Sequence, residues 1–141
     1  MATQLQLTRQ FGTEILEHLS AEAEVPVLQG MQRQGDVLVR PARESYDVAN
    51  SVAVPSNGIP VVRGENGGNT HLLLGEGDVR YLPLEDTGPT SLDLGVMFVG
   101  NGATAYLAHP QHGYMAIGEG TFVFSRQREL SVEDELRIIA D

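Results

Sequence analysis

The sequence contains no cysteine and no lysine, and each absence removes a class of chemistry. Without cysteine the chain has no disulfide framework, no thiolate metal site and no cysteine nucleophile. All nine basic residues are arginine, which excludes Schiff-base and P-loop chemistry. The lack of cysteine also fits a reducing compartment, and we expect a cytoplasmic protein.

Long apolar runs are missing as well. No segment approaches the roughly 20 apolar residues of a membrane helix, and Met1 to Thr8 has no basic run followed by the apolar stretch of a secretory signal. The net charge of −10 repels phosphate backbones. We therefore expect neither a membrane nor a nucleic acid as a partner.

What is present is typical of one globular domain. The chain has 141 residues, of which 41% are hydrophobic, and it can bury a core without a disulfide or structural metal. Apolar residues at a spacing of four predict one N-terminal helix, which Thr8 or Thr13 would cap and Pro26 would follow: Phe11, Ile15, Leu19 and Ala23, with Leu16 alongside. We expect its apolar stripe to pack within the protomer; a subunit contact is the alternative.

Beyond Val25 short apolar runs alternate with turn residues, which predicts strands. We expect a tight turn at Gly118-Glu119-Gly120 and a hairpin turn at Gly100-Asn101-Gly102. The predicted strands are Asp36–Arg40, Pro60–Arg63, Thr70–Leu74, Val79–Leu84, Gly95–Val99, Ala103–Ala108, Tyr114–Ile117, Thr121–Arg126 and Leu136–Ala140. We expect a mainly β fold, a compact antiparallel β-barrel or sandwich with a cupin-like or jelly-roll-like arrangement as one form of it. It would span residues 31–141, with a helical extension over residues 1–30.

Histidines are the residues that could carry chemistry. His71 opens a strand, and His109 and His112 flank Pro110-Gln111, whereas His18 is expected on the surface of the helix. Three imidazoles, with Glu76 as a fourth ligand, would suit a divalent transition metal such as iron, zinc or manganese. The alternative is that each histidine only bonds a turn carbonyl.

Two arginines extend an apolar strand face. With an alternation of two, Arg126 and Arg128 continue the row of Phe122 and Phe124. They could bind a carboxylate or phosphate of a small-molecule ligand, or pair with acidic residues of the protein itself.

Three separated motifs resemble a family of small uncharacterised proteins of bacteria and phages. They are Arg33-Gln34-Gly35-Asp36-Val37, a mid-chain element ending in His71, and His109-Pro110-Gln111-His112-Gly113 with the later Arg126-Gln127-Arg128-Glu129. The paired histidines are also similar to the cupin pattern, which implies a small metal-binding β-barrel. This chain has Asn69 where the family has the first mid-chain histidine, and Glu119 where it has a proline.

The functional expectation is a non-enzymatic β-domain that acts through self-assembly, as a homo-oligomer, or through binding. It follows from the lack of a convergent catalytic set and from the many short strands, whose edges oligomers commonly cover. The alternative is a cupin-like metal-binding protein or metalloenzyme using His71, His109 and His112. A sensor of an anionic ligand through Arg126 and Arg128 is a third hypothesis.

Overall fold

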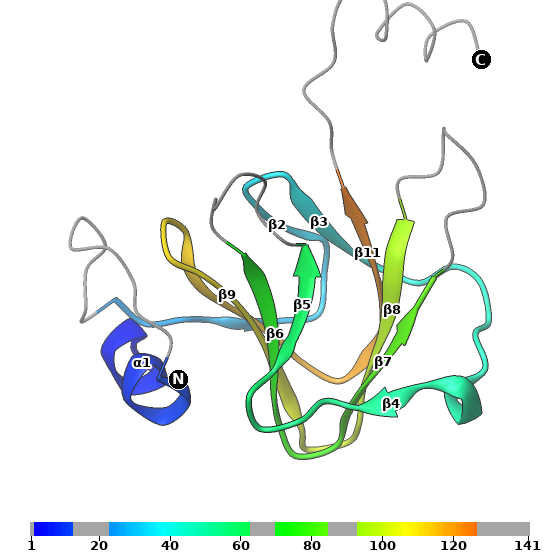
Figure 1. The fold of residues 1–141 in the computed structure, drawn as a ribbon, viewed down its shortest axis with the longest axis horizontal. Coiled ribbons are helices and arrows are strands. Elements are labelled where there is room, and N and C mark those ends of the chain that lie inside the picture. Colours follow the sequence, from blue (N-terminus) through cyan, green and yellow to red (C-terminus); the bar gives the residue numbers. More distant parts are fainter. Residues whose placement is uncertain (1, 13–22, 63–69, 85–92, 127–141) are drawn as a thin grey trace, which may run out of the picture.

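Two β-sheets pack face to face in the computed structural model of the protein (Figure 1). The structure describes residues 2–12, 23–62, 70–84 and 93–126. The first sheet has the order β1-β10-β9-β6-β5 and the second the order β2-β3-β11-β8-β7-β4. The elements are α1 (Gln4–Phe11), β1 (Val27–Leu28), β2 (Gln32–Gln34), β3 (Val37–Pro41), the 3₁₀ turn η1 (Val48–Asn50), β4 (Val52–Ala53), β5 (Ile59–Val62), β6 (His71–Glu76), β7 (Val79–Pro83), β8 (Asp93–Val99), β9 (Thr104–His109), β10 (Gly113–Ile117) and β11 (Gly120–Arg126).

The mainly β fold is confirmed, and of the two predicted architectures the sandwich is the one present. The sheets have five and six strands and do not close into a barrel. Every pairing between the named strands is antiparallel except that of β1 with β10, which is parallel. Eight of the nine predicted strands match observed strands within a few residues, and the ninth, Leu136–Ala140, lies outside the described residues.

The two ends of the sandwich differ in their connections. At one end three short links, residues 77–78, 100–103 and 118–119, carry the chain from one sheet to the other. The predicted hairpin at Gly100-Asn101-Gly102 is therefore wrong: β8 pairs with β7 and β11, whereas β9 lies in the opposite sheet. At the other end the turns at 35–36 and 110–112 join strands that do pair, β2 with β3 and β9 with β10. We call this second end the hairpin end.

Alternation of side chains across the first sheet creates two apolar layers. On β6 and β9, Leu73, Ala105 and Leu107 face the second sheet and pack with its Val39 and Phe124 in the main core. Their neighbours Leu74, Tyr106 and Ala108, with Tyr114 and Ala116 of β10, form a second cluster on the outer face. A sheet that is apolar on both faces needs a cover on its outer side.

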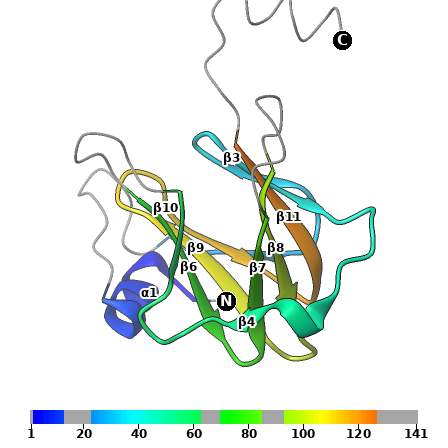
Figure 2. The same cartoon turned by 45° about the vertical axis from the view of Figure 1, so that its right-hand side comes forward.

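Helix α1 lies beside the first sheet and supplies part of this cover (Figure 2). Leu7 is fully buried, and the ring of Phe11 lies 5.3 Å from that of Tyr106. Thr3 caps the helix, and Gly12, at φ 75°, ends it. The prediction that Thr8 is the cap is wrong, because Thr8 lies inside the helix and donates its hydroxyl to the carbonyl of Gln4. The predicted positions Thr13, Ile15, Leu16, His18 and Leu19 lie outside the described residues. No helix in the described part of the chain is long and apolar enough to span a membrane.

Candidate functional site

The strand alternation that builds the core also brings two histidines together. His71 continues the inward row of Leu73, and His109 continues that of Leu107, so both imidazoles lie between the sheets at the hairpin end. His71 is 4% exposed and His109 5%. The core thus ends in two buried polar rings rather than in another apolar layer.

His112 joins them from the β9–β10 turn. The ring centroids of His71 and His109 are 4.3 Å apart, those of His109 and His112 4.6 Å, and those of His71 and His112 6.3 Å. We call these three side chains the histidine cluster. The structure therefore brings together the three histidines predicted from the sequence, although His112 is exposed at the surface.

Glu76, the predicted fourth ligand, does not lie with them. It pairs with Thr104 at the opposite end of β6, five residues from His71, and five residues of extended strand span about 16 Å. Its carboxylate accepts a hydrogen bond from the side chain of Gln10 at 3.2 Å. No three histidine, aspartate or glutamate side chains of the described residues are already grouped so that they could hold a metal ion.

Two residues that the sequence analysis did not assign to the site are Gln34 and Asp36. The amide nitrogen of Gln34 donates to the carbonyls of Leu107 at 2.8 Å and Gly113 at 2.9 Å, while its oxygen lies 2.9 Å from Nδ1 of His71. On the other side of the same ring, Oδ1 of Asp36 lies 3.3 Å from Nε2. Both residues belong to the motif Arg33-Gln34-Gly35-Asp36-Val37, and this motif is the feature of the sequence that indicates them as site residues.

Of the two arginines predicted to bind an anionic ligand, the structure describes only Arg126. Arg126 lies at the hairpin end, where its Nε is 3.6 Å from Oδ2 of Asp36, and its side chain is 41% exposed. This contact fits the alternative of pairing within the protein. Arg128 lies outside the described residues.

Burial sets the charge state of the imidazoles. It lowers the pKa of His71 below the usual 6.5, and the neighbouring Asp36 offsets only part of this shift. Burial, together with repulsion from the other two imidazoles, lowers the pKa of His109 to about 4. Both rings are therefore neutral at pH 7, the form in which histidine binds metal ions.

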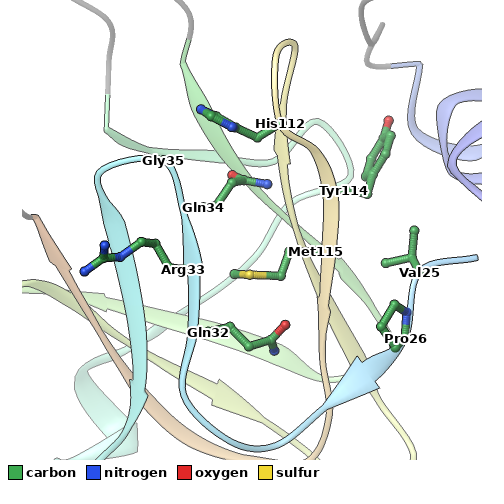
Figure 3. A pocket seen from close by; sticks show the side chains of 9 residues that line it. All are labelled: Val25, Pro26, Gln32, Arg33, Gln34, Gly35, His112, Tyr114 and Met115. Carbon is green, nitrogen blue, oxygen red and sulfur yellow. The ribbon is translucent and has the colours of Figure 1, made fainter. Parts of the chain in front are cut away.

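A pocket of about 450 Å³ lies beside the histidine cluster. Figure 3 shows Gln34 and His112 at its upper end, with the Gln34 amide pointing toward the turn that carries His112. The other lining residues are Val25, Pro26, Gln32, Arg33, Gly35, Tyr114 and Met115. Through this pocket solvent reaches His112, so the cluster is open to small solutes on one side.

Comparison with known proteins places the site inside a family. A family described as a domain of unknown function (DUF8820) matches residues 33–127, which include Gln34, Asp36 and all three cluster histidines. The match starts within the first of the three motifs that carried the resemblance and ends within the last. No curated protein and no solved structure shows significant similarity to the chain.

Proposed function

Because the chain belongs to the DUF8820 family, whose function is unknown, its role has to be inferred from its own site, and we propose that it is a non-enzymatic domain that binds a divalent transition-metal ion at the hairpin end. The observation that carries this proposal is the gathering of three imidazoles within 4.3–6.3 Å, from two strands and a turn. Imidazole nitrogen is the most common protein ligand for such ions.

The charge state supports the same ligand. Burial holds His71 neutral, so a metal ion does not have to displace a proton from this ring at pH 7. His109 beside it is neutral as well and adds no positive charge that would repel the ion. An anionic ligand would instead favour charged imidazoles.

Calorimetric titration of Zn²⁺ or Co²⁺ into protein purified without a histidine tag tests the proposal. We expect one ion per chain and a loss of at least about 100-fold in affinity on His71→Ala, because a ligand and its hydrogen-bonded orientation are both removed. His18→Ala is the matched control, since His18 is the one histidine of the sequence outside the cluster. Absence of saturable binding, or equal losses in the two variants, would contradict the proposal.

A second candidate function, self-assembly, is favoured by the edge strand β1. Val27 and Leu28 are 44% and 45% exposed, and Met31 just beyond them is 62% exposed. Apolar side chains on an unpaired strand edge favour pairing with a second copy. Light scattering over a wide concentration range tests this: we expect dimers that Val27→Lys dissociates, while Val52→Lys on β4, an edge strand of the second sheet, leaves them intact. A strictly monomeric wild type would refute it.

A further inference from the structure

The carbonyls around Gln34 fix the protonation pattern of His71. Leu107 and Gly113 each present a carbonyl oxygen to the Gln34 side chain at 2.8 and 2.9 Å, so the atom between them must be the NH₂ group. The Gln34 oxygen then faces Nδ1 of His71 at 2.9 Å and requires a donor there. The neutral ring therefore carries its proton on Nδ1 and a lone pair on Nε2.

That lone pair faces a carboxylate. Oδ1 of Asp36 lies 3.3 Å from Nε2 of His71, beyond the usual range of an N–H···O hydrogen bond, about 2.7–3.2 Å. Two lone pairs at this distance repel each other unless a cation lies between them. Two ligand atoms that share one ion tetrahedrally, each with a bond of about 2.1 Å, are about 3.4 Å apart.

We propose that Asp36 is the carboxylate ligand of the site and shares the metal ion with His71, so that the ion lies between Oδ1 and Nε2. This inference rests on the proposed function and specifies its ligands. Asp36 takes the role that the sequence analysis gave to Glu76. Arg126 contacts the other oxygen, Oδ2, which leaves Oδ1 available and orients the carboxylate.

The Gln34 contact is what a ligating histidine requires on its far side. Metal-bound imidazoles donate their second ring N–H to a carbonyl or carboxylate, which fixes the ring orientation. In the histidine cluster, His71 makes such a bond, from its Nδ1 to the side-chain oxygen of Gln34. His109 is arranged the opposite way: its Nδ1 accepts the backbone N–H of Gln111 at 3.1 Å, so its proton sits on Nε2. His109 is therefore a neighbour of the ion in this arrangement rather than a ligand.

His112 supplies the third ligand by a side-chain rotation. It is exposed, and no described residue hydrogen-bonds its ring. Its Nε2 lies over Gly35, next to Asp36 in the chain: a Cβ built on Gly35 would be 2.8 Å from it. His112 lies on the pocket, which is the side from which an ion would enter (Figure 3). After the ion has entered, rotation of the His112 side chain toward it closes the site.

The test is Zn²⁺ and Co²⁺ titration of Asp36→Asn against Asp78→Asn. Asparagine keeps the size of the side chain and removes its charge; Asp78 is exposed at the opposite end of the sandwich and controls for the loss of one negative charge. We expect Asp36→Asn to weaken Zn²⁺ binding by about 10- to 100-fold and to change the visible spectrum of bound Co²⁺. We expect Asp78→Asn to do neither.

Histidine nitrogen NMR on the wild type gives a readout that needs no variant. At pH 7 without metal, His71 should show a proton on Nδ1 and none on Nε2, and Zn²⁺ should shift the Nε2 resonance. A doubly protonated His71, or a Zn²⁺ effect on Nδ1 instead, would overturn the inference. If the wild type binds metal and His71→Ala abolishes binding while Asp36→Asn matches Asp78→Asn, the proposed function stands and this inference fails. If the wild type binds none, both fail.

Discussion

Gln34 shows how much structure one buried amide can hold together. Its side chain makes three hydrogen bonds, to two carbonyls of the β9–β10 hairpin and to His71, and it is 4% exposed. A buried polar group costs little when all its bonds are made and much when they are broken. Gln34 thus joins the edge of the second sheet to the first sheet at the point where the histidines lie.

We predict that Gln34→Leu lowers the free energy of unfolding by about 2–4 kcal/mol, because it removes the three buried hydrogen bonds that the amide makes to Leu107, Gly113 and His71. Gln32→Leu is the control: two residues earlier on the same strand, Gln32 is half-buried and donates one bond, to the carbonyl of Ala116 at 3.1 Å. Its loss should be near 1 kcal/mol. Urea denaturation measures the free energy of unfolding of both variants. Equal losses would show that the three hydrogen bonds of Gln34 stabilise the fold no more than the single bond of Gln32.

His109 makes the stability of the metal-free protein depend on pH. Its pKa is about 4 in the folded chain against 6.5 as the ordinary value, so the unfolded chain binds the extra proton first. The contribution is fully present above pH 6.5 and is lost as the pH falls toward 4. We predict that in EDTA the wild type loses stability over this window more steeply than His109→Asn, by about 1 kcal/mol or more. Parallel pH profiles of the two proteins would contradict this.

At the scale of elements, the β2–β3 turn positions the site. Gly35 has φ 58°, a left-handed conformation that other residues adopt at a cost. This turn brings Asp36 back toward His71, and the missing Cβ at Gly35 makes room for the His112 ring. The glycine therefore serves both the turn and the third histidine.

Gly35→Ala should therefore do more than strain the backbone. We predict a loss of about 1–2 kcal/mol in stability from the left-handed conformation, together with weaker metal binding, because the new methyl displaces His112. Gly102→Ala is the matched control, since Gly102 has φ 75° and nothing within 4 Å of its Cβ position. It should lose similar stability and keep its metal affinity. Unchanged Zn²⁺ affinity in Gly35→Ala would argue against a role for His112.

For the whole molecule, the alternation of apolar residues predicts a mainly β fold and eight of the observed strands, but it leaves barrel and sandwich open and misses the short strands β1, β2 and β4. It also explains the meeting of His71 and His109, since each lies two residues from a core leucine. Glycines indicate a turn but not whether the strand after it stays in the same sheet or crosses to the other one. The hairpin predicted at Gly100-Asn101-Gly102 is therefore wrong, because the chain crosses between the sheets there. Asp36 was missed because its nearness to His71 depends on how the second sheet packs on the first, which no local spacing encodes. Closeness in sequence points to Glu76 as a ligand, but an extended strand carries it to the far end of β6, away from His71.

The central claim is that the hairpin end holds a metal ion between His71 and Asp36. The most direct measurement is a crystal structure of the wild-type chain grown with Zn²⁺, with data collected on both sides of the zinc absorption edge. The account predicts an anomalous peak within about 2.2 Å of both Nε2 of His71 and Oδ1 of Asp36. A zinc-saturated crystal whose anomalous peaks all lie elsewhere, with the His71–Asp36 contact unchanged, would contradict it.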